Sequence, residues 1–179
     1  MADAKHSIRR VVTGQGPNAR SRIDIDGLPS HDMTLPDGTV ILDVWQTAAA
    51  PALLGFGSGD VTDGTMALKP PVGGSTFRVA DIAPATQLDS AASEALFKQM
   101  GSGDAFSGAP ETRGIMHRTE TIDYGIILRG SMTLIMEDGE TILNAGDVYV
   151  QRGSNHAWYN HTNDFCRLAV VMVDAKYTE

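Results

Sequence analysis

The sequence has few cysteines and few basic residues, and each scarcity excludes a class of structure or partner. It holds a single cysteine, Cys166, so no internal disulfide can form. Basic residues are in the minority, with 14 Lys and Arg against 22 Asp and Glu and a formal net charge of −8. A surface of this sign repels phosphate backbones, so we expect no nucleic-acid partner.

Long apolar runs are also missing. The longest, Leu168 to Val173, has the length of a strand and falls far short of the ~20 residues that a membrane-spanning helix needs. We therefore expect no membrane association. Residues 1–10 carry basic side chains with no apolar stretch behind them, which is not the pattern of a secretory signal. Together with the free cysteine, this favours a cytoplasmic location.

What the chain does have is an ordinary globular composition, with 42% hydrophobic and 20% charged residues over 179 positions. In the first half, β-branched and alternating segments predict strands at Ile8–Thr13, Thr39–Trp45 and Ser75–Ala80. One helix is predicted over Asp89–Met100, because apolar residues recur there at helical spacing and Gly101 follows as a stop signal.

From Gly114 onward short β-type runs follow one another at even spacing, separated by glycine-containing turns. The Asp138-Gly139 pair between two such runs is a strong hairpin signal. This pattern predicts an antiparallel sandwich or barrel, and it is not repeated in the first half. The predicted strands are Tyr124–Leu128, Ser131–Met136, Thr141–Leu143, Asp147–Gln151 and Arg167–Val173.

Two segments carry a family resemblance. Gly114–Gly130 resembles the first motif of the cupin superfamily, and Gly146–Asn160 resembles the second. The resemblance is to the small, single-domain members of that superfamily with one conserved barrel. It implies an all-β fold, a double-stranded β-helix or jelly-roll barrel, here with added N-terminal strands and the one short helix. We expect the barrel over residues 75–179 and an N-terminal extension over residues 1–74.

The resemblance also implies a set of metal ligands. His117 matches the first histidine of the family pattern, His156 the last, and Asp123 the usual Glu. Thr119 stands where a second histidine is expected, and Gln151 stands where a proline is usual. The expected site is therefore reduced to two histidines and one aspartate. Such a set suits a divalent ion, Fe, Zn, Mn or Ni.

Strand periodicity gives independent support, because residues two apart share a face. His117, Thr119 and Asp123 would then point one way, if the strand extends that far. The alternative is a metal-free interior in which His117 and Asp123 form a buried hydrogen-bonded pair. Asp is one methylene shorter than Glu, which weighs toward that alternative.

The resemblance leaves two classes of function open. The first is a small-molecule enzyme, of dioxygenase or lyase, decarboxylase or dehydratase type, acting on a small oxygenated or aromatic organic acid in the barrel. Asp123 would then be a ligand or general base, Thr119 would contact the substrate, and Tyr124 and Trp158 would line its pocket. The second is a non-catalytic cupin that binds a small ligand without a functional metal.

Four further expectations complete the sequence-based description. Residues Asp89–Pro110 are a candidate lid at the barrel mouth. Family resemblance and exposed strand edges predict a homodimer. Cys166 precedes an apolar run and is expected in the core rather than as a nucleophile. His31 and His161 lie in loops and are expected to be solvated.

Overall fold

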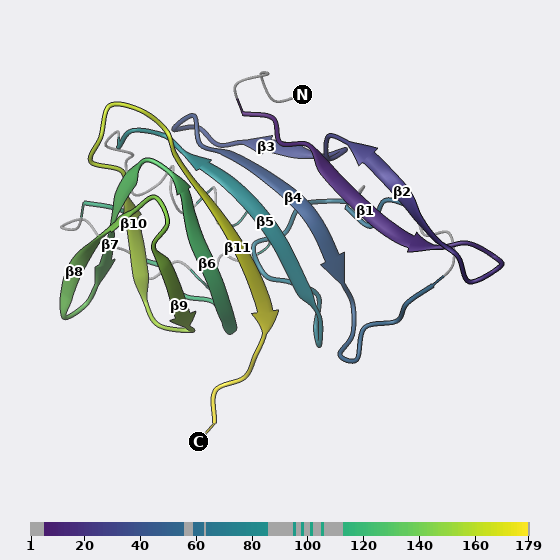
Figure 1. Cartoon of the computed structure of the whole chain (residues 1–179). Helices are drawn as coiled ribbons and strands as arrows, with labels where there is room; N and C mark the ends of the chain where they lie inside the picture. Colours follow the sequence, from purple (N-terminus) through teal and green to yellow (C-terminus); the bar gives the residue numbers. More distant parts are fainter. Residues whose placement is uncertain are drawn as a thin grey trace.

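The structure is a computed structural model that describes residues 6–55, 59–62, 64–85 and 113–178, with Ala95, Lys98, Gly101 and Ala105 between them. The elements that lie wholly within these residues are strands (Figure 1). They are β1 (Arg10–Gln15), β2 (Ser21–Gly27), β3 (Asp32–Thr34), β4 (Val40–Thr47), β5 (Ser75–Ile82), β6 (Thr121–Arg129), β7 (Ser131–Met136), β8 (Gly139–Asn144), β9 (Val148–Arg152), β10 (His156–Tyr159) and β11 (Cys166–Asp174).

Two antiparallel sheets form the body. The larger has the order β3-β4-β5-β11-β6-β9 and the smaller the order β10-β7-β8. Strand β11 lies in the middle of the larger sheet and pairs with β5 on one side and β6 on the other. The last strand of the chain thus joins the first half to the second, as Figure 1 shows. The expected all-β barrel is confirmed.

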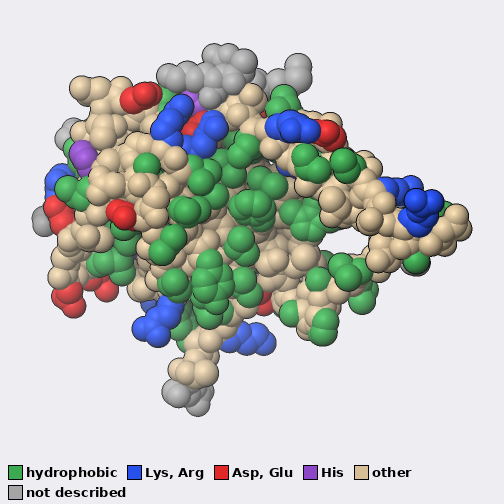
Figure 2. All heavy atoms as spheres, viewed as in Figure 1, with side chains coloured by type: hydrophobic (Ala, Val, Ile, Leu, Met, Phe, Trp, Pro, Cys, Tyr) green, Lys and Arg blue, Asp and Glu red, His purple; other side chains and the backbone are tan. Residues whose placement is uncertain are grey.

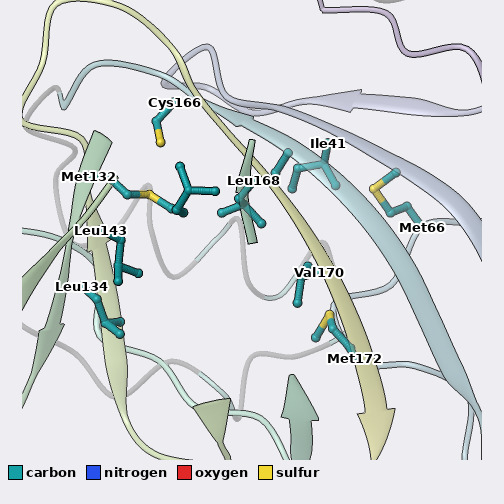
Figure 3. Close-up of a cluster of buried hydrophobic side chains, with 11 residues drawn as sticks. Ile41, Met66, Met132, Leu134, Leu143, Cys166, Leu168, Val170 and Met172 are labelled. Atoms are coloured by element: carbon teal, nitrogen blue, oxygen red, sulfur yellow. The ribbon is translucent and has the colours of Figure 1, made fainter. Parts of the chain in front are cut away.

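The main core lies between the two sheets (Figure 3). Met132, which is fully buried, and Leu134 come from β7, while Leu168, Val170 and Met172 come from β11. Alternation along the strands produces this core, because every second side chain of β6, from Thr121 to Ile127, is buried.

The N-terminal strands extend the larger sheet. Strand β4 pairs with β5 over nearly its whole length, and β3 forms the edge, so these two strands are added to the barrel sheet. Strands β1 and β2 form a separate two-stranded sheet. His6 Nδ1 lies 2.9 Å from Asp81 Oδ2, and Arg167 donates to both oxygens of Asp81 at 2.7 and 2.6 Å. The division of the chain at residue 75 stays a prediction.

Two turn glycines have the backbone geometry that their positions require. Gly146 has φ +95° and Gly153 has φ +64°, both in the region that favours glycine. They bound β9, and Gly153 begins the loop that leads to β10. These turns therefore set the path of the chain toward His156.

The predicted helix at Asp89–Met100 lies almost wholly outside the described residues. Ala95 and Lys98 are described, and both are helical. The suggested lid over Asp89–Pro110 lies outside them for the same reason. Within the described part of the chain, no helix has the length and apolar character needed to cross a bilayer.

Candidate functional site

Two histidines that lie 39 positions apart in the sequence are neighbours in space. His117 and His156 exchange backbone hydrogen bonds at 2.9 Å in both directions, as an isolated antiparallel bridge. Their ring centroids are 4.3 Å apart and the ring planes are inclined by 47°. This spacing lets two imidazoles approach a common point.

Backbone carbonyls orient both rings. Nδ1 of His117 lies 2.9 Å from the carbonyl oxygen of Ile115, and Nδ1 of His156 lies 3.0 Å from that of Ser154. Because a carbonyl oxygen only accepts, each Nδ1 carries the proton and each Nε2 is left with its lone pair. That is the tautomer in which a histidine binds a metal through Nε2.

The side chain of Gln151 supports the loop before His156. Its Nε2 donates to the carbonyl oxygen of Ser154 at 2.8 Å and to the Ser154 hydroxyl at 2.9 Å. The same carbonyl accepts from the His156 ring. Gln151, which replaces the usual proline, therefore fixes this loop through hydrogen bonds instead of through a rigid ring.

Both histidines are held in the neutral form. Desolvation, followed by the repulsion of His117, lowers the pKa of His156 to about 3. Desolvation also lowers the pKa of His117. At neutral pH the pair is uncharged, which is the state that coordinates a metal.

Asp123 lies on the inward face of β6 and is buried. Its Oδ1 accepts no hydrogen bond from any described residue, although it is shielded from solvent. Desolvation raises the pKa of Asp123 to about 6, while Thr121 and Arg78 act in the opposite direction. A buried oxygen without a donor is costly, so it points to a missing partner such as an ion, a water molecule or a substrate group.

The structure brings the histidines together but does not add Asp123 to them. Among the described residues, no three His, Cys, Asp or Glu side chains lie close enough to hold one ion. The pairing explains the separation: His156 belongs to the smaller sheet through β10, whereas Asp123 pairs with Gln151 and Met172 in the larger one. Of the three residues expected to converge, only His117 and His156 therefore do so.

Two aromatic side chains, Trp158 and Tyr149, lie between the histidine pair and Asp123. Trp158 makes an edge contact with His156, with centroids 5.6 Å apart, and lies 5.0 Å from the Tyr149 ring. Desolvation and then the charge of Asp123 raise the pKa of Tyr149, and the two residues lie on the neighbouring strands β9 and β6. Trp158 is half-buried, and its place in a substrate pocket stays a prediction. Tyr149 is a neighbour of this site that the sequence analysis missed.

An arginine inside the barrel was also missed. Arg78 is buried on the inward face of β5 and pairs with Asp43, its Nε and Nη2 lying 2.7 and 3.2 Å from the carboxylate oxygens. Nη2 also donates to the carbonyl oxygen of Ala67 at 2.6 Å. Arg78 and Asp123 lie on the two strands that flank β11, opposite Val170 and Met172, and the positive charge of Arg78 lowers the pKa of Asp123. The alternation of Ser75–Ala80 is the sequence signal that places Arg78 inward.

Two of the remaining site residues have contrasting positions. Thr119 is buried, and its hydroxyl lies 2.7 Å from that of Thr121. Tyr124 is 54% exposed and lies on the opposite face of β6 from Asp123. The expectation that Tyr124 lines the pocket is therefore wrong, because adjacent residues of a strand point to opposite faces.

The other singled-out residues have simpler environments. Cys166 is fully buried in the main core, and desolvation raises the pKa of its thiol to about 11, which confirms a packing role. His161 is exposed, with Nδ1 at 3.1 Å from the Thr133 hydroxyl. His31 borders a hollow of about 420 Å³ beside β3, away from the predicted site residues.

Comparison with known proteins identifies a cupin domain in the second half of the chain. Residues 106–173 match the family model described as Cupin domain. Phomopsin biosynthesis cluster protein C' of Diaporthe leptostromiformis is 46% identical over 72 residues, which are 39% of this chain and 38% of that protein. The cupin-domain-containing oxidoreductase virC of Hypocrea virens is 42% identical over 72 residues, 38% of this chain and 37% of that protein.

The match to these relatives therefore spans little more than a third of their length. Among solved structures, a Cupin 2 conserved barrel domain protein from Salinispora arenicola is 17% identical, with a TM-score of 0.37 over 56% of this chain and 64% of that one. The family match contains all three residues of the expected ligand set, His117, Asp123 and His156. On its two motifs and this match, the segment over residues 106–173 is a cupin domain.

Proposed function

We propose that this chain is a metal-dependent oxidoreductase that acts on a small organic acid inside the barrel. The observation that supports it most directly is the paired, neutral histidines, His117 and His156, with both Nδ1 atoms held by backbone carbonyls. Relatives at 42% identity over 72 and 71 residues are named cupin-domain-containing oxidoreductases, which favours redox chemistry over the lyase, decarboxylase and dehydratase alternatives.

The residues fit a metal in part. Two imidazole nitrogens would hold it, which leaves several positions for water, dioxygen or the substrate. A centre with two histidines and oxygen ligands suits Fe(II) best, although Zn, Mn and Ni accept similar sets. When bound, Fe(II) would supply one-electron chemistry and a positive charge that attracts an acidic substrate.

In this proposal Asp123 exchanges a proton with the substrate. Its orphaned Oδ1 faces the interior, and its pKa of about 6 lets it accept or return a proton near neutral pH. Thr119 is buried close to the same strand and would contact the bound molecule, while Trp158 gives the pocket an apolar wall between the histidines and Tyr149.

Arg78 supports an acid as the substrate class. Asp43 and the Ala67 carbonyl engage its Nε and Nη2, and no described residue accepts a hydrogen bond from Nη1. An inward guanidinium whose Nη1 group is not engaged can donate a charge-assisted hydrogen bond to a carboxylate. The site would then hold the acidic group near Arg78 and the reacting carbon near the histidines.

Metal analysis followed by reconstitution tests the proposal. Chelated protein is titrated with Fe(II) alone, and oxygen uptake is then followed with a panel of small aromatic and oxygenated carboxylic acids. We expect one Fe(II) to bind per chain and at least one acid to be oxidised. His117→Ala and His156→Ala should lose both properties. Stoichiometric binding without oxidation of any acid, or no binding, would overturn the oxidoreductase proposal.

A second candidate is a barrel that works without a metal. It is favoured by the separation of Asp123 from the histidine pair and by the raised pKa of that carboxyl. Such a protein would bind an acid as a non-catalytic receptor, or would move a proton through Asp123. Binding of an acid to chelated protein, unchanged in His156→Ala and lost in Arg78→Met, would favour this candidate.

A further inference from the structure

The segment at the end of β11 and just beyond it, residues 174–177, is held against one end of the barrel. The carboxylate of Asp174 accepts a hydrogen bond from Gly73 N at 2.7 Å, and Ala175 N donates to the carbonyl oxygen of Glu120 at 2.9 Å. Figure 1 shows the segment leaving β11 beyond the ends of β6 and β9, at the same end of the barrel as the loop between β9 and β10. This segment therefore lies beside the strands that carry the histidine pair.

Tyr177, in this segment, contacts the loop that leads to His156. Its hydroxyl donates to the carbonyl oxygen of Gly153, the first residue of that loop. The next carbonyl, that of Ser154, orients the His156 ring and accepts from Gln151 Nε2. The loop is thus held from the interior by the buried Gln151 and from outside by the exposed Tyr177.

The ring of Tyr177 also reaches the segment that carries His117. The guanidinium carbon of Arg118, the residue after His117, lies 5.9 Å from the ring centroid, which is within the range of a cation–π contact. The two histidine-bearing segments are close at this point, because a Cβ on Gly153 would lie 3.0 Å from Tyr177 Oη and 3.3 Å from the carbonyl oxygen of Thr119. Tyr177 therefore contacts both segments that meet in the histidine bridge.

Packing accounts for little of this contact. Tyr177 is 54% exposed, and Figure 2 shows the segment projecting from the body of the molecule, with Lys or Arg side chains on either side. A hydroxyl that solvent can reach gains little net free energy when it exchanges water for a backbone carbonyl. The contact does restrict the loop, however, and so it narrows the range of directions that the His156 ring can take.

We propose that Tyr177 is a positioning residue that fixes the loop before His156 against the His117 segment, so that both Nε2 atoms face one point. This role rests on the metal site of the proposed function. Removing a group that orients a metal-binding histidine typically weakens metal binding by roughly 10- to 100-fold. Tyr177 acts through the Gly153 carbonyl, one residue further from the ring, so we expect an effect of about 10-fold.

Two tyrosines of equal exposure allow a matched test. Tyr177→Phe removes the hydroxyl and keeps the ring, and Tyr124→Phe on the outward face of β6 is the control, because both tyrosines are 54% exposed. Chelated proteins are titrated with Fe(II) alone, without oxygen. Tyr177→Phe should raise the dissociation constant about 10-fold, whereas Tyr124→Phe should match the wild type. An unchanged dissociation constant in Tyr177→Phe, or a rise matched by a lower melting temperature of the chelated protein, would overturn the proposal.

A measurement without metal separates this role from the proposed function. In chelated protein labelled with ¹⁵N at histidine, the proton on Nδ1 of His156 reports its hydrogen bond to Ser154. Its exchange with water should be about 5-fold faster in Tyr177→Phe than in the wild type or Tyr124→Phe, as expected for one lost hydrogen bond. If the wild type binds no Fe(II), the proposed function fails and this exchange rate alone decides the role of Tyr177. Equal rates in all three proteins would overturn the positioning role whether or not metal binds.

Discussion

Gly125 of β6 and Tyr149 of β9 stand opposite each other, and the tyrosine ring lies where a side chain at position 125 would be. They are register partners, and a Cβ on Gly125 would fall 2.1 Å from Cζ of Tyr149. The missing side chain therefore lets Tyr149 lie against the sheet, in contact with Trp158 and close to Asp123. A glycine inside a strand here marks a close approach of an aromatic ring.

Gly125→Ala should consequently displace Tyr149 and destabilise the barrel by about 1–3 kcal/mol, because the added methyl overpacks a filled interior. Chemical denaturation measures the loss, and near-ultraviolet circular dichroism reports the changed tyrosine environment. Gly27→Ala is the matched control, since nothing lies within 4 Å of a Cβ there. Equal stability of the two variants would show that Tyr149 does not occupy this position.

The raised pKa of Asp123, about 6 against an ordinary 3.8, gives a pH-dependent stability. The folded protein holds this proton more tightly than the unfolded chain. The resulting stabilisation is fully present below the unfolded pKa and is lost as the pH rises through the folded pKa. In chelated protein, the wild type should lose about 3 kcal/mol relative to Asp123→Asn between about pH 3 and about pH 7.

Denaturant titrations at several pH values check this difference. Asp138→Asn changes a carboxylate in the exposed turn between β7 and β8 and serves as the control, with a stability within about 0.5 kcal/mol of wild type throughout. A pH-independent difference between wild type and Asp123→Asn would contradict the desolvated position of Asp123.

Metal retention should depend on the histidines and not on Thr119. His156→Ala removes one nitrogen of the pair and should abolish most Fe(II) binding, measured by elemental analysis after desalting. Thr119→Ala should retain the metal, because the Thr119 hydroxyl is already engaged with Thr121. Thr119→His should tighten binding by adding the ligand that the family pattern places there. Metal retained in full by His156→Ala would exclude the histidine pair as the binding site.

The two turn glycines should differ in their tolerance of a side chain. Valine at either position is forced into the left-handed region, at a cost of about 1–3 kcal/mol. At Gly153 the new Cβ would also lie 3.0 Å from Oη of Tyr177, whereas nothing lies within 4 Å at Gly146. Gly153→Val should therefore lower the melting temperature more than Gly146→Val. Adding Tyr177→Ala should recover part of that loss, and no recovery would place the whole cost in the backbone.

Much of the fold follows from the sequence alone. Alternation and turn glycines locate β5 to β9 and β11 closely, because the burial of every second side chain and the need for positive φ are local requirements. The same local signals mark His117, Asp123 and His156 as inward-facing. The expectation that Tyr124 lines the pocket conflicts with the same alternation. Tyr124 follows Asp123 directly and therefore points outward, where it is 54% exposed.

Only the tertiary structure decides which of these residues meet. His117 and His156 become neighbours through a bridge between distant segments, while Asp123 belongs to the opposite sheet, and no local pattern encodes that distance. Arg78 acquires its place near Asp123 in the same way, through pairing of β5 and β6 with β11. The two-residue period of a strand determines which face a side chain occupies, and strand pairing determines which side chains lie next to it.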